Sequence, residues 1–449
     1  MSSAHVWEDE KDKPNIEITG QDCCKNVLYG RRIDDHKTKV VKVGVAVPTP
    51  KDYIRIQQGN EVYEQEAHSP TRNYFGRILQ LLGGIIDSDS ASISIRKQDG
   101  SIPAGSAWIR MFCTTIGTLY VLNKGYYSPV DIDASGMVLG TDDTAWTFDD
   151  VKPGSLILQG TAAGKLVYHQ TAIPIVTYSA AGVPSWTVKS RRFFDNLNAN
   201  ANTITIKEVC QLSSIWNYNA FSFNALEERT VLNTPYNILY KEGVVVTYVR
   251  KLEIPSYATI GLTGNGIGIL MSLSCGIDQV GAGVYGAGHL SMKSSIGNIY
   301  DGNWGATWAF NRGGGVYPYG DPLAIAGVTT SGSLAGQGNT ACAASDFILE
   351  NLFTHGVGAN QLIYPAQGTA SAAYNAGTKT LTVTQVRVVT NSNAGNQIVK
   401  EVGIMGEFYA VNTTLLRQFL VSRTVLGSPI TLANGESLAI VHDFSMTHN

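Results

Sequence analysis

The sequence predicts a mainly β protein with two tandemly duplicated antiparallel β-sandwich units, one short helix and an extended N-terminal arm. Three observations indicate this fold: an internal repeat, alternation of polar and apolar residues with a period of two, and a composition rich in glycine and poor in charge. Of the 449 residues, 15% are charged, 44% are hydrophobic and 47 are glycine. A chain of this length has room for two or three domains.

The composition also narrows the function classes. The hydrophobic content excludes disorder as the main state of the chain, because disordered chains combine low hydrophobicity with high net charge. The formal net charge of −3 argues against a dedicated nucleic-acid surface. We expect no transmembrane helix, because the chain has no run of 18 apolar residues. The start, Met1 to Lys13, is polar and acidic and lacks the apolar stretch of a secretory signal.

The internal repeat is the strongest signal in the sequence. The segment from Gly160 to Tyr168 matches the segment from Gly356 to Tyr364, with each position 196 residues later. Three further blocks keep the same order and nearly the same offset: 140–145 with 336–341, 206–209 with 399–402, and 228–232 with 422–426. Because four collinear matches are not expected by chance, we interpret 137–253 and 333–447 as two copies of one β unit.

Strand patterns occur inside both copies. Polar and apolar residues alternate from Thr203 to Ile206 and from Thr380 to Thr384, and threonine and valine favour the half-buried surface of a sheet. The segment from Ile430 to Val441 predicts a hairpin, because Asn434-Gly435 provides the positive φ of a tight turn. Short strands joined by such turns indicate an antiparallel sandwich.

One helix is predicted near residues 70–83. Ser69 has the side chain of an N-cap, Pro70 fits the first helical position, and the pair Gly83-Gly84 ends the pattern. The apolar residues between them follow helical spacing: Phe75, Ile78, Leu79 and Leu82. The helix either caps the sandwich core, which we favour, or docks on a neighbouring subunit.

These patterns divide the chain into three parts. Residues 1–55 form an extended N-terminal arm, 56–255 the first β-sandwich unit, and 256–449 the second unit. The second unit includes a glycine- and aromatic-rich insertion at 257–335. We interpret its aromatic residues as an interaction surface for a partner chain, with a stacking platform for sugars as the alternative; they are Tyr300, Trp304, Trp308, Tyr317 and Tyr319.

No catalytic constellation stands out, so we predict that the protein is not an enzyme and needs no cofactor. The six cysteines contain no CxxC pair, and scattered cysteines of this kind are mostly small buried residues. One segment has the oxygen spacing of a calcium loop, from Asp131, Asp133, Ser135 and Asp142. Its flanks resemble strands and its last position lacks glutamate, so we favour a polar turn and predict no metal site.

Several motifs resemble those of the tail and structural proteins of tailed-bacteriophage virions. They are the Ser-Pro-Thr-Arg-Asn helix start at 69–73, the His-Gly-x-Gly-x-x-x-Leu-x-Tyr block at 355–364, the turn leading to Lys-Glu-Val-Gly at 391–403, and Arg-Thr-Val-Leu-x-x-Pro-Ile-x-Leu-x-Asn-Gly-Glu-x-Leu at 423–438. The resemblance covers the second copy well. The first copy departs from it, with Gln159 in place of His355 and Cys210 in place of Gly403.

The resemblance implies a structural role in a phage virion, assembled in the host cytoplasm. We expect a homo-oligomeric ring or collar in the neck, tail or baseplate, whose partners are copies of itself and other virion proteins, with no direct nucleic-acid or membrane contact. A duplicated unit suits such a ring, because three chains then present about six similar faces. The alternatives are a capsid-surface or decoration protein and a carbohydrate-binding or carbohydrate-cleaving tail spike.

Overall fold

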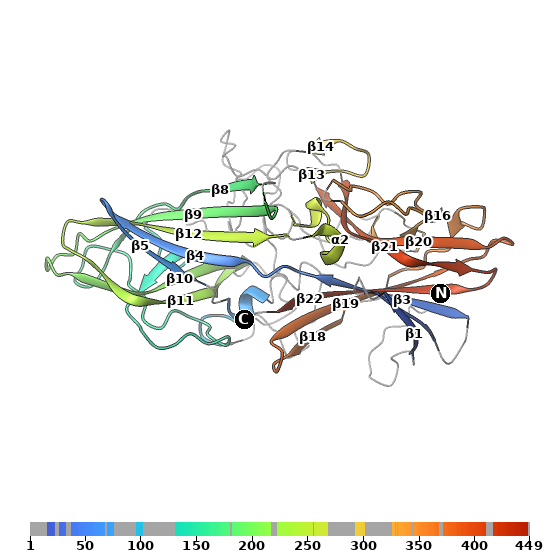
Figure 1. The fold of residues 1–449 in the computed structure, drawn as a ribbon. Helices are drawn as coiled ribbons and strands as arrows, with labels where there is room; N and C mark the ends of the chain where they lie inside the picture. Colours follow the sequence, from blue (N-terminus) through green and yellow to red (C-terminus); the bar gives the residue numbers. More distant parts are fainter. Residues whose placement is uncertain are drawn as a thin grey trace.

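The protein is mainly β, as predicted, and its strands form two sandwiches that lie end to end (Figure 1). The computed structural model describes residues 16–22, 27–32, 37–67, 70–75, 96–101, 131–179, 182–216, 222–254, 256–267, 292–300, 326–327, 329, 331–343, 345–367, 371–409 and 416–447. Among the described strand pairs, pairing is antiparallel except between β22 and β3 and between the two-residue strands β16 (Thr354–His355) and β17 (Gln361–Leu362).

The first unit packs a large sheet against a small one. The large sheet has the order β5-β4-β12-β9-β7, with β8 also paired to β9, and the small sheet has the order β11-β10-β6. One buried apolar cluster joins the two sheets and includes Ile56, Phe194 and Val246 from the large sheet and Leu139 and Leu212 from the small one. The strand bounds are β4 Lys51–Gln58, β5 Glu61–Glu66, β6 Gly136–Gly140, β7 Val167–Tyr168, β8 Ala172–Ser179, β9 Ser185–Asp195, β10 Ile204–Trp216, β11 Ser222–Ile238 and β12 Gly243–Glu253.

The second unit has the same two-layer arrangement. Its large sheet has the order β1-β2-β3-β22-β19-β18, and its small sheet has the order β15-β20-β21. The strand bounds are β1 Ile16–Asp22, β2 Val27–Arg32, β3 Thr38–Ala46, β15 Gly332–Gly336, β18 Ser371–Asn375, β19 Thr380–Thr390, β20 Gln397–Tyr409, β21 Leu416–Leu432 and β22 Ser437–Thr447. A separate two-strand hairpin contains β13 (Met292–Lys293) and β14 (Ile299–Tyr300).

Strands at repeat-related positions have the same lengths in the two units. β9 and β19 have 11 residues each, β10 and β20 have 13, β11 and β21 have 17, and β12 and β22 have 11. The pairing of β10 with β11 shifts register between 206 and 208 and between 211 and 212, and that of β20 with β21 shifts between 399 and 401 and between 404 and 405. The two units therefore follow one plan, whereas their common origin by duplication stays a prediction.

The structure carries this correspondence further towards the N-terminus than the sequence indicated. The amide of Thr71 donates to the carbonyl oxygen of Glu227 and its hydroxyl to that of Leu226. The same contacts recur 192 residues later, where the amide and hydroxyl of Thr263 donate to the carbonyl oxygens of Val421 and Leu420. A short helical segment follows in each case, at 72–75 and at 264–267.

A turn shows the same extension. The amide of Gly100 donates to the carbonyl of Lys97, as that of Gly297 does to the carbonyl of Ser294, and both glycines have a positive φ, at 82° and 85°. The residues 257–335 were predicted to be an insertion. Their first part instead matches the segment of the first unit that precedes its small sheet, with 263–267 and 294–297 corresponding to 71–75 and 97–100. The two related stretches begin near residues 70 and 262.

The predicted helix begins later than the sequence indicated. The described helical residues are 72–75, and Pro70 forms an isolated β-bridge with Glu228 instead of occupying the first helical position. The carbonyl of Thr71 accepts the amides of Tyr74 and Phe75, so the helix begins after Thr71. Ser69 and the predicted apolar positions Ile78, Leu79 and Leu82 lie outside the described residues. Phe75 is buried, which agrees with a helix that caps the core.

Residues 38–58 contribute one strand to each of the two large sheets, and β1 and β2 pair antiparallel beside β3. We call residues 38–58, which contain β3 and β4, the strap. β3 pairs in parallel with β22, from Thr38 opposite Ser437 to Ala46 opposite Ser445. β4 pairs antiparallel with β12, from Lys51 opposite Lys251 to Gln57 opposite Val245. β3 and β4 run in the same direction along the strap. Since β22 is parallel to β3 and β12 is antiparallel to β4, β12 and β22 point towards each other, as Figure 1 shows.

The junction between the units is filled with apolar side chains. Val47 of the strap, Phe75 and Leu252 belong to the same buried cluster as the core of the second unit. Phe148 of the first unit stacks on Tyr374 of β18, with ring centroids 5.0 Å apart and an interplanar angle of 6°. The amide of Val47 also donates to the carbonyl of Ser445 at 2.8 Å. The junction therefore extends the core of the second unit up to the first unit, whose own core is a separate cluster.

The strap is attached differently to the two units. Towards the second unit, β3 buries Val41, Val43 and Val45 in the apolar cluster. Towards the first unit, β4 likewise buries Ile54 and Ile56 in an apolar cluster. It also buries Asp52, whose carboxylate accepts hydrogen bonds from Arg250 at 2.8 Å and from the Tyr248 hydroxyl at 2.6 Å. Arg250 also pairs with Glu228, and all three charged side chains are about 1% exposed. An ion pair in this position fixes the register of β4, because a shift by one residue would turn Asp52 to the opposite face.

Replacing Asp52 by alanine should lower the free energy of unfolding by about 3 kcal/mol, because the buried Arg250 loses a charged partner. Lys51→Ala is the control, since the Lys51–Glu253 pair is largely exposed and exposed ion pairs contribute little to stability. Chemical denaturation of both variants measures the difference. Equal stability of the two variants would show that the pair does not anchor the strap.

Candidate functional site

A buried arginine lies at the centre of the small sheet in the first unit. Arg229 on β11 donates to Glu208 on β10 at 2.6 Å, to Asp150 at 2.9 Å and to Asp142 at 2.7 Å. Asp142 also accepts the hydroxyl of Thr144. Burial acts to lower the pKa of Arg229, but the hydrogen bonds with Glu208 and Asp150 outweigh it and raise the pKa above its usual value. The guanidinium thus ties the 142–150 loop to the sheet.

The second unit repeats this centre. Arg423 on β21 donates to Glu401 on β20 and to Asp346, both at 2.7 Å, and it lies 3.4 Å from Glu350. Glu350 accepts the hydroxyl of Thr340. The pKa of Glu401 is raised by burial, against the opposing effect of Arg423. Each arginine is therefore surrounded by three carboxylates and one threonine hydroxyl.

One carboxylate of each centre comes from a different position in the loop. At an offset of 196 residues, position 142 corresponds to 338 and position 154 corresponds to 350. The first unit has Asp142 and Gly154, and Asp142 supplies the carboxylate. The second unit has Gly338 and Glu350, and Glu350 supplies the carboxylate. A Cβ on Gly154 would lie 1.8 Å from Asp142, and a Cβ on Gly338 would lie 2.3 Å from Glu350. The acid and the glycine have exchanged places, and the charge count at the arginine is kept.

A second buried arginine in each unit donates to backbone carbonyls. Arg192 donates to the carbonyls of His169, Ile132, Ser135 and Met137 and lies 4.8 Å from the Tyr168 ring. Arg387 repeats this with the carbonyls of Pro365, Ser331 and Ser333 and the Tyr364 ring at 4.9 Å. Burial lowers the pKa of each arginine to about 10, so both stay charged at neutral pH. They satisfy backbone carbonyls where the chain enters the small sheet.

Gln159 in the first unit and His355 in the second occupy equivalent positions and have the same structural role. The amide of Tyr168 donates to Oε1 of Gln159 at 2.6 Å, and the amide of Tyr364 donates to Nδ1 of His355 at 3.1 Å. Each side chain therefore satisfies the same backbone group in its unit. This departure from the phage-protein motif leaves the turn unchanged.

The four residues of the calcium-loop pattern do not come together. Asp131 and Asp133 both accept hydrogen bonds from Gln159, through its side chain and its backbone amide, each at 2.7 Å. Asp142 instead lies in the Arg229 centre, while the carbonyl of Ser135 accepts from Arg192. Within the described ranges, no group of three or more histidine, cysteine, aspartate or glutamate side chains could hold a metal ion.

The predicted aromatic interaction surface lies almost entirely outside the described residues. Only Tyr300 falls within them, as the last residue of β14. Trp304, Trp308, Tyr317 and Tyr319 are not described, so this prediction stays open.

The ends of the two units differ where their backbones agree. In the first unit the side-chain amide of Asn196 donates to the carbonyl of Ile238, the last residue of β11, at 2.8 Å. In the second unit that of Asn391 donates to the carbonyl of Leu432, the last residue of β21, also at 2.8 Å. In the first unit the adjoining turns expose Leu197 (44%), Leu239 (52%) and Tyr240 (40%). The equivalent residues of the second unit are Ser392, Ala433 and Asn434. We call Leu197, Leu239 and Tyr240 the apolar tip.

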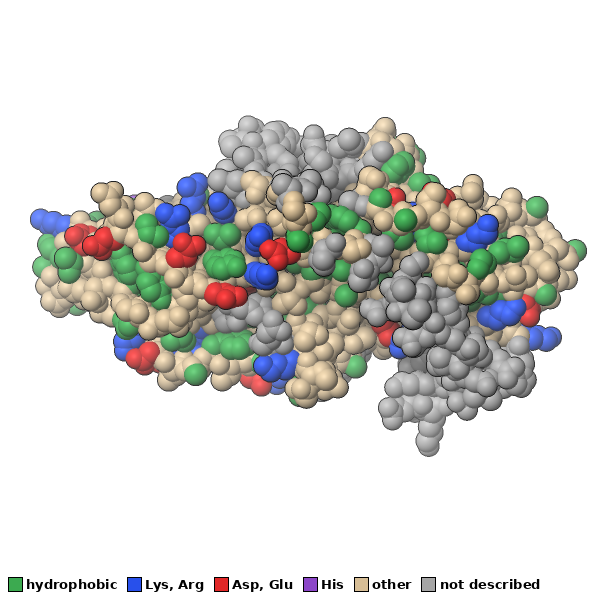
Figure 2. Space-filling model, in the orientation of Figure 1, with side chains coloured by type: hydrophobic (Ala, Val, Ile, Leu, Met, Phe, Trp, Pro, Cys, Tyr) green, Lys and Arg blue, Asp and Glu red, His purple; other side chains and the backbone are tan. Residues whose placement is uncertain are grey.

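The rest of the visible surface is mixed. On the coloured part of the face in Figure 2, acidic and basic side chains alternate along the large sheet of the first unit, and neither sign forms a continuous patch. Since the hydrogen bonds that shape the turns are alike in both units, the apolar tip is not required by the fold. It is therefore the candidate contact surface.

No known family model, curated protein or solved structure matches this chain. Among the described helices, none has the length and apolar character to cross a membrane. The function must therefore be argued from the geometry and from the sequence motifs.

The exchanged acid and glycine predict a compensating double substitution. Gly154→Glu alone should lower the free energy of unfolding by about 1–3 kcal/mol, because it forces a steric clash. Asp142→Gly alone should also lower it, because it removes a partner of the buried Arg229. The double variant copies the second unit and should regain most of that loss. Denaturant unfolding of all four proteins gives the coupling energy. Additive losses in the double variant would contradict the equivalence of the two positions.

A buried histidine predicts a pH dependence of stability. His442 on β22 is fully buried, its Nδ1 lies 3.1 Å from the Ser333 hydroxyl, and burial lowers its pKa to about 3. The unfolded chain binds a proton near pH 6.5 and the folded one does not, so protonation favours unfolding. The stability associated with neutral His442 is complete above about pH 6.5 and is lost as the pH falls towards 3.

His442→Gln should therefore flatten the loss of stability between pH 6.5 and 3, by up to about 1.4 kcal/mol per pH unit relative to the parent protein. Unfolding free energies measured in the same buffers give both slopes. Parallel slopes for the two proteins would mean that His442 titrates normally in the folded state.

Proposed function

We propose that this protein is a structural component of a tailed-phage virion that forms a homo-oligomeric ring or collar in the neck, tail or baseplate. The observation that carries the proposal is the end-to-end pair of like sandwiches, which share a buried junction, together with an apolar tip on the first unit whose equivalents in the second unit are Ser392, Ala433 and Asn434. The phage-protein motifs in the sequence support the same role. Assembly would take place in the host cytoplasm, with other virion proteins as neighbours.

The architecture suits a mechanical part. A junction that buries Val47, Phe75 and Leu252 and stacks Phe148 on Tyr374 resists bending between the two units. The carboxylates of the Arg229 and Arg423 centres are held in ion pairs that fix loops. These charged groups maintain shape, and they leave the surface turns free to differ between the units.

The apolar tip gives the chain one end that favours burial. Three exposed residues of this size on adjoining turns lose water contact when they meet an apolar surface at a different place on another copy of the chain. Because the second unit has Ser392, Ala433 and Asn434 at the same positions, the two ends of the chain differ in their side chains. A chain with distinct ends can form closed rings by repeated contacts, whereas a surface that pairs with itself gives twofold dimers.

The test is the mass of the full-length protein in solution, by sedimentation velocity at micromolar concentration. We expect a stable oligomer that the double variant Leu239→Asp/Tyr240→Asp weakens at least about tenfold, which corresponds to about 1.4 kcal/mol. The matched control is Ala433→Asp/Asn434→Asp, which places the same charges on the equivalent turn of the second unit. It should leave the mass unchanged.

Two outcomes would contradict the proposal. A parent protein that stays monomeric at these concentrations would remove the basis for a ring. An oligomer that weakens equally in both double variants would show that general surface charge, and not the apolar tip, controls association.

A further inference from the structure

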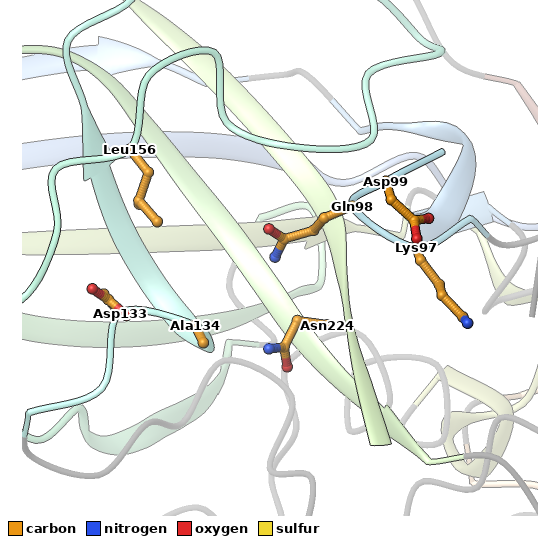
Figure 3. A pocket seen from close by; sticks show the side chains of 7 residues that line it. All are labelled: Lys97, Gln98, Asp99, Asp133, Ala134, Leu156 and Asn224. Atoms are coloured by element: carbon orange, nitrogen blue, oxygen red, sulfur yellow. The ribbon is translucent and has the colours of Figure 1, made fainter. Parts of the chain in front are cut away.

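An open pocket lies on the first unit between elements that are far apart in sequence. The turn at 97–99, the loop at 133–134, Leu156 and Asn224 on β11 surround a cavity of about 290 Å³ (Figure 3). In Figure 3 the side chain of Gln98 points into the space between Asp133 on one side and Asn224 below it. The volume is close to the lower limit of small-molecule pockets.

The turn that forms one wall of this pocket is held in place. Its backbone closes through hydrogen bonds between Lys97 and Ser101 at 3.0 Å and between Gly100 and Lys97 at 2.9 Å. The preceding residue, Arg96, exchanges two hydrogen bonds with the side chain of Asn73, at 2.7 and 3.1 Å. The pocket wall is therefore anchored to the helix start and is not a loose loop.

The second unit closes the equivalent space. Gln98 corresponds to Ser295, 197 positions later, and Asn224 to Gln418, 194 positions later. The amide of Ser295 donates to the carbonyl of Gln418 at 2.8 Å, and its hydroxyl lies 3.4 Å from the Gln418 side chain. In the described part of the first unit, no hydrogen bond joins Gln98 to Asn224. The same turn is thus docked on the sheet in one unit and separated from it in the other.

The polar groups that face the pocket have unused hydrogen-bonding capacity. Within the described residues, the side chains of Lys97, Gln98 and Asn224 make no hydrogen bond. Asp99 accepts from Ser101, and Asp133 accepts from the Gln159 amide, each through one carboxylate oxygen. Leu156 and Ala134 add an apolar wall. A ligand here would meet donors and acceptors on several sides and carbon on one.

This set of groups discriminates between ligand classes. A phosphate or other anion would face the carboxylate of Asp133, and a divalent cation would find only that one carboxylate beside two neutral amides, so neither is favoured. A hydroxyl group both donates and accepts, so a neutral polyhydroxylated molecule can satisfy the amides of Gln98 and Asn224 and the carboxylate of Asp133 together. The C–H face of a sugar ring would pack on Leu156 and Ala134.

We propose that this pocket of the first unit binds a saccharide unit, with Gln98 and Asn224 as the residues that recognise its hydroxyl groups. This binding function goes beyond the proposed structural role and does not depend on the oligomeric state. It would give an assembled ring one saccharide-binding position per chain, because the second unit has closed the counterpart.

The experiment uses the full-length protein with D-glucose, D-galactose, D-mannose and N-acetyl-D-glucosamine as probes, observed by saturation-transfer NMR and titrated by calorimetry. We expect at least one probe to bind with a Kd of about 1 mM, as a small polar site allows. Gln98→Ala and Asn224→Ala should each weaken that binding about tenfold. Gln418→Ala, at the closed counterpart, is the matched control and should leave it unchanged.

The proposal would be overturned if no probe binds at a concentration about ten times the expected Kd, or if binding survives both pocket substitutions. It would also be overturned if inorganic phosphate or Ca²⁺ binds at the pocket and no saccharide does. Thermal unfolding of each variant confirms that a loss of binding is not a loss of fold. A monomeric parent protein that still binds a saccharide would contradict the ring alone, so the two proposals can fail separately.

Discussion

The architecture depends on one constraint: a single strap must complete the large sheets of two sandwiches. A strand has donors and acceptors along both edges, and it can pair with either polarity of neighbour. Residues 38–46 use the parallel ladder with β22, and residues 51–58 use the antiparallel ladder with β12. The two sandwiches must therefore meet end to end, which brings Val47, Leu252 and Phe75 together in one core. The junction, and with it the distance between the two tips, follows from this pairing.

Within that frame, what the two units share maintains the fold and what differs between them is available for function. Both units keep a carboxylate-bound arginine at Arg229 and Arg423 and a carbonyl-bound arginine at Arg192 and Arg387. The units differ at their exposed turns and at the pocket beside Asn224, where the backbone plan does not require a difference. These differences are compatible with the proposed structural role, in which the interior maintains shape and the exposed turns make the contacts.

Part of this could be predicted from the sequence. The alternation at 380–384 and the Asn434-Gly435 turn reflect local geometry, so the sandwich strands were accessible to pattern analysis. The helical and turn segments near 71–75 and 263–267 were not recognised as related, because their shared contacts go to a strand more than 150 residues away. The partnership of Asp142 with Arg229 was also hidden, because the two residues are 87 positions apart and the counterpart Glu350 occupies a different loop position. The apolar tip and the pocket depend on exposure, which the sequence pattern does not reveal.

The central claim is that one continuous segment holds both units as a single body, and amide hydrogen exchange of the folded full-length protein tests it most directly. If the strap belongs equally to both sheets, the amides of β3 and β4 exchange as slowly as those of β22 and β12, through openings close to global unfolding. Fast amide exchange throughout β3 or β4, while the partner strand β22 or β12 stays protected, would contradict the claim. It would mean that the strap opens from that unit independently and that the two sandwiches are separate bodies.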